Sequence, residues 1–303
     1  MRESETSAGT GMTSIGAAQA AAPGAGVSLW RRRIRRYCRS VPGTAGLSII
    51  VFWVAAALLA PLIAPFSPTE INLQALADPT PSPMHWLGTD HIGRDMLSRI
   101  LWGARTVLTV APIAVLGATF VGTVFGLTAG YFGGWYDLLV MRCADIVLSF
   151  PMIILYMIVI VMFGASALNI ILVISVTKAP IIARIVRGIT LELREREYVV
   201  AAKLRGESAL FIMLVEILPN ARGPIIVEMC LRMGFTIVMI GILGFLGIGL
   251  PPPHPDWGSM VKDTYGLIFS WPHMALFPCA AISSLVIGFN LMAIGLREYR
   301  FHG

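Results

Sequence analysis

The sequence predicts an all-α polytopic membrane protein with six transmembrane helices. The first observation is composition: of 303 residues, 56% are hydrophobic and only 13% are charged, and the mean hydropathy is +0.76. Soluble domains carry about 25% charged residues because their surface faces water. The second observation is that six stretches reach the roughly 20 apolar residues that a helix needs to cross a bilayer.

The predicted spans are separated by charged or proline-rich segments. Pro61 and Pro65 end the first span, because proline interrupts a helix and restricts the residue before it. The six spans cover residues 44–66, 104–131, 138–163, 167–188, 223–249 and 273–296. They divide the chain into a basic, disordered tail at 1–40, the first span and an outer segment at 41–103, a core at 104–298 with a cytoplasmic loop at 189–222, and a short tail at 299–303.

The distribution of basic residues predicts the orientation. An even number of spans places both termini on one side of the membrane. Counted by topology, 19 of the 23 Lys and Arg residues fall on that side or at its span ends, most of them in the N-terminal tail and between Lys178 and Arg232. Lys and Arg are retained on the cytoplasmic side, so both termini are predicted to be cytoplasmic. The net charge of +6 follows from this pattern, and no nucleic-acid partner is expected.

The loop at 189–222 has a helical pattern on each side of a glycine. Helix-forming residues fill 191–205, and Gly206 then permits the positive φ that ends a helix. A second amphipathic helix is predicted after it, ended by Pro219 and Asn220. Charge surrounds the apolar face of this loop. Its pattern fits equally a surface that docks another protein and a solvated hairpin that only links two spans.

The residues of this loop carry a resemblance to a known family. They include Glu197, Tyr198, Ala201, Ala202, Gly206, Leu218, Pro219 and Asn220. This run resembles the EAA loop of importer permeases of the ATP-binding-cassette class. Stretches at 85–99, 245–260 and 290–297 resemble signatures of the dipeptide/oligopeptide/nickel permease family, in its C-type subunit. Two positions depart from the family pattern: Val200 stands where the family usually has Glu, and Arg205 where it usually has Leu.

The resemblance implies a type I importer-like membrane domain in a bacterial cytoplasmic (inner) membrane, translocating di- or oligopeptides. It implies a second permease subunit in a heterodimer, two ATP-binding subunits that dock on the loop at 194–220, and an extracytoplasmic solute-binding protein. ATP and Mg would be held by the partner ATPase. Import of nickel, glutathione or glycosides by the same family is the alternative.

The chain itself carries no motif for ATP hydrolysis or metal binding. No Gly-Lys dipeptide occurs, so the phosphate loop G-x-x-x-x-G-K-[ST] is absent, and no G-x-S-x-G, H-E-x-x-H or C-x-x-C occurs. We therefore expect no enzymatic activity, no cofactor and no metal. Four histidines fall on the predicted outer side, but no pair has ligand spacing on one helix: His85, His91, His254 and His273.

Ionisable residues within the spans are candidates for the translocation path, because a charge at membrane depth is costly. The candidates are Asp145, Lys178, Glu228 and Arg232. Glu228 and Arg232 are four residues apart, which favours a mutual ion pair that only fixes packing. For Lys178, a role in the path and a role in packing between spans fit the pattern equally.

Residues 90–105 have the pattern of an amphipathic helix at the outer interface. Apolar residues between Met96 and Ala104 share one face, and Arg94 and Arg99 lie largely on the other. This pattern favours a membrane-surface anchor. The alternative is a surface that meets the extracytoplasmic binding protein or flanks the substrate entrance.

Two other classes of protein fit the sequence less well. An ATP-independent secondary transporter would predict an inverted repeat, and none is evident; the charged loop at 189–222 would also be unexplained. A membrane-embedded enzyme would need a convergent catalytic set at membrane depth, and none is visible.

Overall fold

The computed structural model describes residues 40–76, 78–251 and 253–301 of the chain. Within these residues every regular element is a helix, and no strand occurs. The predicted tail at 1–40, apart from Ser40, lies outside the described residues, and so does Cys38. The all-α prediction is confirmed for the part of the chain that the structure covers.

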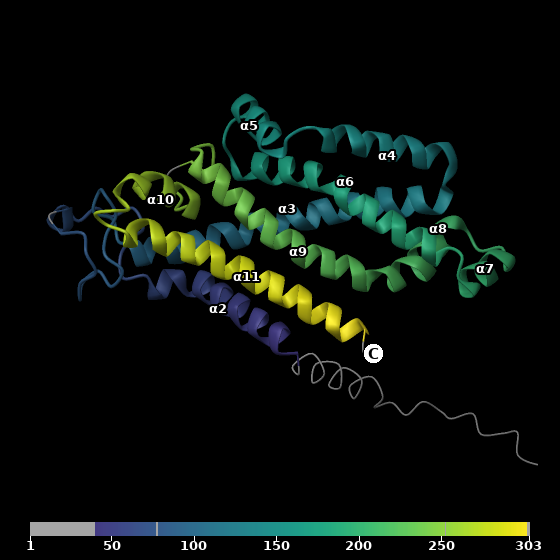
Figure 1. The fold of residues 1–303 in the computed structure, drawn as a ribbon, viewed down its shortest axis with the longest axis horizontal. Coiled ribbons are helices and arrows are strands. Elements are labelled where there is room, and N and C mark those ends of the chain that lie inside the picture. Colours follow the sequence, from purple (N-terminus) through teal and green to yellow (C-terminus); the bar gives the residue numbers. More distant parts are fainter. Residues whose placement is uncertain (1–39, 77, 252, 302–303) are drawn as a thin grey trace, which may run out of the picture.

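Long helices lying side by side make up the body of the molecule (Figure 1). Five of them are long and apolar enough to cross a membrane. They are α2 (Val41–Ile63), α3 (Met96–Phe132), α6 (Ala167–Leu193), α9 (Leu218–Phe245) and α11 (His273–Phe301). The remaining elements are shorter: α4 (Gly134–Ser149), α5 (Met152–Phe163), α7 (Glu197–Leu204), α8 (Ala209–Phe211), α10 (Trp257–Thr264), a π-helix at Ile212–Ile217, and 3₁₀ turns at Leu73–Leu76 and Tyr265–Leu267.

The third predicted span, 138–163, is not one straight helix. It is divided into α4 and α5, which meet at an angle of 84°. Phe150 leaves the helical region, with φ −82° and ψ 138°, and Pro151 follows it. Proline disfavours the α conformation of the residue before it and has no N–H to donate, which accounts for the break. If the bent pair counts as one span, the structure has the predicted six.

The separate interfacial helix predicted at 90–105 is wrong. Residues 90–95 lie outside the helix, and Asp95 caps the first turn of α3 by accepting a hydrogen bond from the Ser98 N–H over 2.7 Å. From Met96 onward the chain continues as one helix to Phe132. Arg99, expected on a solvated face, is buried near Asp90. The outer turns of this helix are packed inside the protein, which argues against a membrane-surface anchor.

A stripe of glycines joins α3 to α6. Gly122, Gly126 and Gly130 recur at every fourth residue of α3, so they share one face. A Cβ at Gly122 would lie 2.7 Å from the Cβ of Ile182, and one at Gly130 would lie 2.7 Å from the Cβ of Thr190. Small residues at this spacing allow two membrane helices to approach closely. The α3–α6 pair forms the centre of the bundle.

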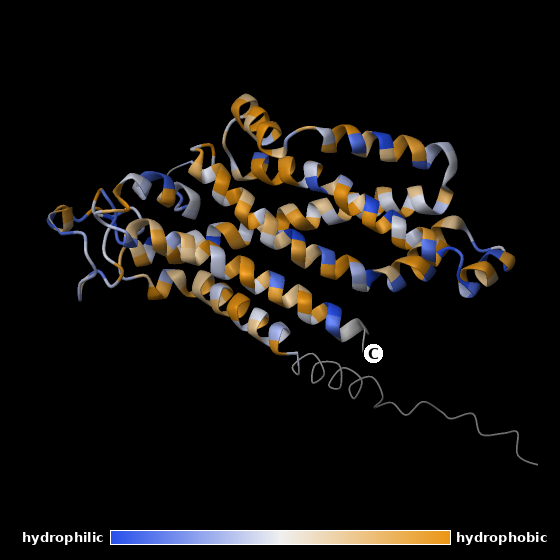
Figure 2. Cartoon of the chain, viewed as in Figure 1, coloured by the Kyte–Doolittle hydropathy of each residue, from blue (hydrophilic) through white to orange (hydrophobic). Residues whose placement is uncertain are grey.

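The helices α2 and α11 pack together, which brings the two described ends of the chain to one end of the bundle. The Ser40 hydroxyl donates to Glu298 over 2.6 Å. This end also holds α7, while α10 lies at the opposite end (Figure 1). Hydrophilic residues gather at the outer segment and around α7, with mostly hydrophobic helices between them (Figure 2). By the distribution of basic residues, the end with α7 is cytoplasmic.

Candidate functional site

The turn predicted at Gly206 is present in the cytoplasmic loop. The helix α7 ends there, and Gly206 adopts φ +78°, a conformation that side chains rarely allow. The Glu207 N–H donates to the Ala202 carbonyl over 3.2 Å, and the Gly206 N–H donates to the Lys203 carbonyl over 3.0 Å, so the last carbonyls of α7 are satisfied. A Cβ at Gly206 would meet nothing within 4 Å. The requirement for glycine therefore comes from the backbone angle and not from space.

The second half of the loop differs from the prediction. We expected a short helix ended by Pro219 and Asn220, but helical structure continues from Ala209 to Phe245. A π-helical stretch at Ile212–Ile217 precedes Pro219, and its wider turn accommodates a residue that has no N–H to donate. The Asn220 side chain donates to the Glu216 carbonyl over 2.7 Å. The loop is thus continuous with the membrane helix α9.

The inner face of the loop belongs to the core of the bundle. Val199 and Ala202 of α7 and Ile217 of the π-helix are completely buried. They form one cluster with residues of α3 and α6, including Leu127 and Ile182. Full burial of each Val or Ile side chain contributes about 1.5–3 kcal/mol. The loop is therefore fixed to the membrane helices.

A hydrogen bond from the end of α6 reinforces this attachment. The Arg194 guanidinium donates to the Gly130 carbonyl at the end of α3 over 3.0 Å. Because the guanidinium is charged, this bond is stronger than one between neutral groups. Displacement of the loop would therefore disturb both α3 and α6.

Large apolar side chains of the loop are exposed among charged neighbours such as Lys203 and Arg205. Leu204 and Leu210 are 84% and 63% exposed. Exposed apolar patches on a protein surface mark sites of interaction. We call this surface the docking face and define it by seven residues: Tyr198, Val200, Leu204, Leu210, Phe211, Leu214 and Val215.

The other predicted loop residues lie around the docking face. Glu197, Ala201, Gly206, Pro219 and Asn220 are exposed, whereas Leu218 is half-buried. Ala202 instead faces the core. The predicted set is therefore divided between an outer surface and an inner anchor.

The two positions that depart from the family pattern have different surroundings. Val200 is 43% exposed and belongs to the docking face. Arg205 bridges the Gly206 turn, with its guanidinium 3.6 Å from Glu216 and 3.8 Å from Glu207. The charge at Arg205 is thus paired within the loop.

The predicted path residues fall into two groups. Glu228 and Arg232 of α9 form the expected ion pair. Lys178 of α6 is buried near enough to Arg232 for their charges to repel, and it forms no ion pair within the described part of the chain. Asp145 lies apart from them on α4, where it pairs with Arg184 of α6.

Sequence analysis missed a second ion pair between α4 and α6. The Arg187 guanidinium donates to the Asp137 carboxylate over 2.6 Å. Together with Arg184 and Asp145, it joins the cytoplasmic half of the bent span to α6. Arg184 and Arg187 are three residues apart and share a helix face, so this spacing was the signal that could have identified the pair.

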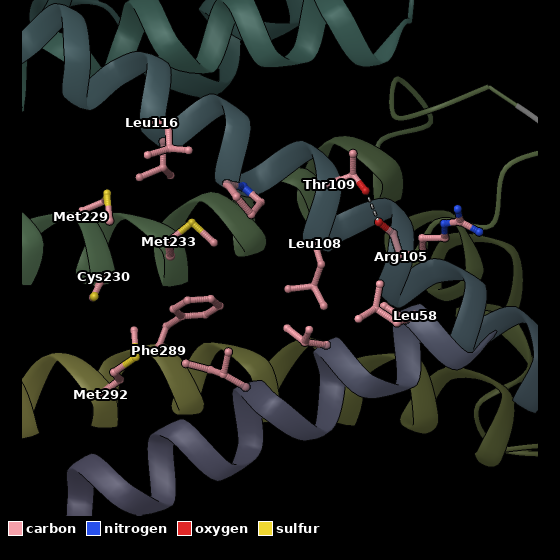
Figure 3. Close-up of a pocket in the computed structure, with 15 residues that line it drawn as sticks. Leu58, Arg105, Leu108, Thr109, Leu116, Met229, Cys230, Met233, Phe289 and Met292 are labelled. Atoms are coloured by element: carbon pink, nitrogen blue, oxygen red, sulfur yellow. Dashed lines mark hydrogen bonds between the residues drawn. The ribbon is translucent and has the colours of Figure 1, made fainter. Parts of the chain in front are cut away.

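An apolar pocket of about 430 Å³ lies between α2, α3, α9 and α11 (Figure 3). Leu116, Met229, Met233, Phe289 and Met292 point toward it from three of these helices. Methionine side chains adapt to irregular apolar surfaces. Chemically, the pocket suits an apolar group, since Arg105 and Thr109 are the polar residues of its lining.

Two of the four outer histidines, His85 and His273, have structural partners. The His85 Nδ1 lies 3.0 Å from the Asp95 carboxylate, and the His273 Nε2 lies 3.0 Å from the Pro79 carbonyl. In the described ranges, no cluster of three or more His, Cys, Asp or Glu side chains could hold a metal ion.

Comparisons with known proteins agree with the loop and the bundle. The model of the family "Binding-protein-dependent transport system inner membrane component" matches residues 122–299, more than half of the chain. A second model, "N-terminal TM domain of oligopeptide transport permease C", matches residues 28–79.

Relatives extend this similarity over most of the chain. The dipeptide transport system permease protein DppC of Alkalihalophilus pseudofirmus is 41% identical over 90% of this chain and 89% of its own length. DppC of Haemophilus influenzae is 39% identical over 84% and 88%. The glutathione transport system permease protein GsiD of Pectobacterium atrosepticum is 35% identical over 89% of each chain. The chain therefore belongs to the family of binding-protein-dependent inner-membrane transport components, the permease subunits of ATP-binding-cassette importers.

Proposed function

We propose that this permease subunit imports short peptides and that its cytoplasmic loop at 194–220 is the docking site of an ATP-binding subunit. The observation that carries the docking site is the two-sided structure of the loop. Its outer side, the docking face, is exposed and apolar, while its inner side is built into the bundle core. A partner that binds the outer side can therefore move the membrane helices.

This arrangement acts as a lever. Closure of two ATP-binding subunits on ATP would draw two such loops together, and α9 would transmit the movement because it continues from the loop without a break. ATP binding can shift the permease between inward-open and outward-open states only if the ATP-bound partner has a different affinity for each. ATP and Mg would be held by the partner.

The assembly that we propose contains four further proteins. A second permease subunit, different in sequence, would complete the membrane path. Two ATP-binding subunits would occupy the two cytoplasmic loops, and an extracytoplasmic binding protein would deliver the solute. The family description, which names binding-protein-dependent transport, supports the last of these.

Peptides are the substrate class that the relatives favour. Two of the relatives described above are dipeptide permeases, and the third is a glutathione permease. Glutathione is itself a small peptide, so glutathione import is the second candidate. Lys178 is the residue that we assign to the path, because a charged group that faces a water-filled path avoids the cost of burial in lipid. Glu228 and Arg232 instead pair with each other, which fits a role in packing.

Co-purification tests the docking site. The substitution Leu204→Glu places a charge on the docking face without disturbing the core, because Leu204 is 84% exposed. We expect it to reduce the amount of ATP-binding subunit that co-purifies with the chain by at least about tenfold, since a buried unpaired charge costs several kcal/mol. The matched control is Phe269→Glu, a similar change at a 99% exposed residue of the outer side.

Two results would count against the proposal. Equal recovery of the ATP-binding subunit with Leu204→Glu and with Phe269→Glu would remove the docking face from the mechanism. Peptide uptake that persists without ATP would favour a secondary transporter.

A further inference from the structure

A polar pocket of about 330 Å³ opens at the outer end of the bundle, remote from the docking face. Three elements surround it: the first turn of α3, the last turn of α9, and the helix α10. Its volume is within the range of small-molecule sites. Seven of the residues that line it have polar or ionisable side chains: Thr69, Arg94, Arg99, His254, Ser259, Lys262 and Asp263.

The cations of this pocket are incompletely neutralised. Arg94 and Arg99 share one carboxylate oxygen of Asp90, at 2.7 Å and 3.4 Å. Arg99 is only 5% exposed, and its Nε has no hydrogen-bond partner in the described structure. A buried donor without an acceptor is costly. Lys262 forms no ion pair within the described residues, although it lines the same pocket.

The other buried acids near this pocket are already engaged. Asp256 accepts hydrogen bonds from the Gly258 and Ser259 N–H groups at the start of α10, at 3.3 Å and 3.2 Å. Asp95 caps α3 and holds His85. Neither carboxylate is therefore directed to the Arg99 Nε or to Lys262.

The wall of the pocket is made of closely packed backbone. A Cβ at Gly249 would lie 2.6 Å from the Gly244 Cα and 2.9 Å from the Asp256 carboxylate. Gly247 adopts φ +81°, and Lys262 lies against it. The glycines therefore fix the turn after α9 and leave the lysine at the rim.

Asp263 adds a negative charge to the pocket beside Arg99 and Lys262. Asp263 lines the pocket and acts electrostatically on Arg99, but it makes no ion pair with Arg99 within the described residues. The pocket thus offers both signs of charge within a small volume. A short peptide carries a carboxylate and an ammonium group, which for two residues lie within about 7 Å of each other.

We propose that this outer pocket binds a short zwitterionic peptide, with its carboxylate at Arg99 and Lys262 and its ammonium group at Asp263. The inference rests on the proposed function, since it assigns to this chain an external site for the imported solute. Guanidinium groups suit carboxylates because they present donors in a fork. The site would hold the peptide after release from the binding protein and before it enters the membrane path.

Direct binding tests the proposal. The assembled membrane complex in lipid nanodiscs, without ATP and without binding protein, is titrated with radiolabelled Ala-Ala. We expect Lys262→Gln to weaken the binding of Ala-Ala about tenfold or more, because it removes a charge that hydrogen-bonds to the peptide carboxylate. Lys262→Arg keeps a positive charge and should retain binding. The control Arg297→Gln removes a positive charge at the cytoplasmic end, outside the docking loop, and should leave binding unchanged. Lys262 and Arg297 are both exposed, so neither change should affect folding.

Modified peptides separate the two ends of the ligand. Ala-Ala amide, which lacks the carboxylate, should bind weakly to the wild type and should respond little to Lys262→Gln. Asp263→Asn should weaken the binding of Ala-Ala but not that of N-acetyl-Ala-Ala, because the acetylated peptide has no ammonium group. Equal binding of Ala-Ala by Lys262→Gln and the wild type would overturn the inference.

Two further outcomes are distinguishable. If Lys262→Gln weakens attachment of the binding protein but not of Ala-Ala, the pocket receives a protein carboxylate and the peptide site is wrong. If the wild-type complex, with ATP and its binding protein, takes up no peptide at all, the proposed function itself fails.

Discussion

Arg205 and Glu216 lie on opposite sides of the Gly206 turn, with Nη2 of the first 3.6 Å from Oε1 of the second. The Arg205 side chain is 55% exposed and the Glu216 side chain 24% exposed, so water screens their attraction. An ion pair of this kind contributes about 0–1 kcal/mol. The turn therefore keeps its shape chiefly through the φ of Gly206 and the buried residues beneath the loop.

This pair should contribute little to stability. In a double-mutant cycle of Arg205→Leu and Glu216→Gln, we expect a coupling energy below about 1 kcal/mol, because both groups remain partly hydrated. The measurement is the denaturant unfolding of the purified complex. A coupling of several kcal/mol would show that the pair, and not the backbone, maintains the turn.

The glycine stripe of α3 should be far more sensitive. A Cβ at Gly126 would lie 2.8 Å from the Val186 Cβ and would collide with the Ala183 carbonyl. We expect Gly126→Val to destabilise the chain by about 1–3 kcal/mol or more through overpacking, measured as a lower Tm and a lower yield of assembled complex. Gly188→Ala on α6 is the control, because a Cβ there meets nothing within 4 Å. Equal Tm values for the two variants would contradict this packing.

Asp256 should make the outer segment sensitive to pH. Burial raises the pKa of Asp256 from 3.8 to about 6, against the opposing effects of the Ser259 and Gly258 N–H groups and of Arg99. The folded state thus holds this proton more tightly than the unfolded state. The resulting stabilisation is complete below about pH 4 and is lost as the pH rises through about 6.

The pKa shift of Asp256 is large enough to be detected as a change of Tm with pH. A shift of about two pKa units corresponds to at most about 3 kcal/mol. We expect the Tm of the wild type to fall between about pH 5 and about pH 7.5 by more than that of Asp256→Asn, which keeps an N-cap oxygen but does not titrate. Parallel curves for the two proteins would exclude this titration.

Lys178 tests the membrane path. It is 7% exposed, is repelled by Arg232, and has no acidic partner within the described residues. Replacing it with Met removes a costly buried charge, so the variant should be as stable as the wild type or more so. We expect uptake to fall at least about tenfold if the ammonium group meets the solute, since each tenfold corresponds to about 1.4 kcal/mol. Unchanged uptake and stability would remove Lys178 from the path.

Several elements could be predicted because a local pattern determines them. The spans follow from runs of apolar residues, and the turn at Gly206 follows from the one residue that tolerates its φ. The pair of Glu228 and Arg232 follows from helical spacing. Each of these depends on neighbours within a few residues in the sequence.

The bend at Pro151 could not be predicted in this way. Pro112, Pro180 and Pro224 each lie inside a continuous helix, because neighbouring helices and local adjustments satisfy the freed backbone groups. Sequence alone does not tell which proline breaks its helix. The position of Arg99 was missed for a similar reason, since its partner Asp90 lies in a turn whose path depends on tertiary contacts.

The central claim is that the Gly206 turn transmits ATP-driven movement to the membrane helices. Gly206→Val strains a backbone at φ +78° without any steric contact, at a cost of about 1–3 kcal/mol. Gly266→Val, where a Cβ also meets nothing within 4 Å and φ is not positive, is the control. The measurement is peptide uptake per ATP hydrolysed by the assembled complex. We predict that Gly206→Val still assembles and hydrolyses ATP but loses at least about tenfold in uptake; normal uptake by an assembled Gly206→Val complex would contradict the claim.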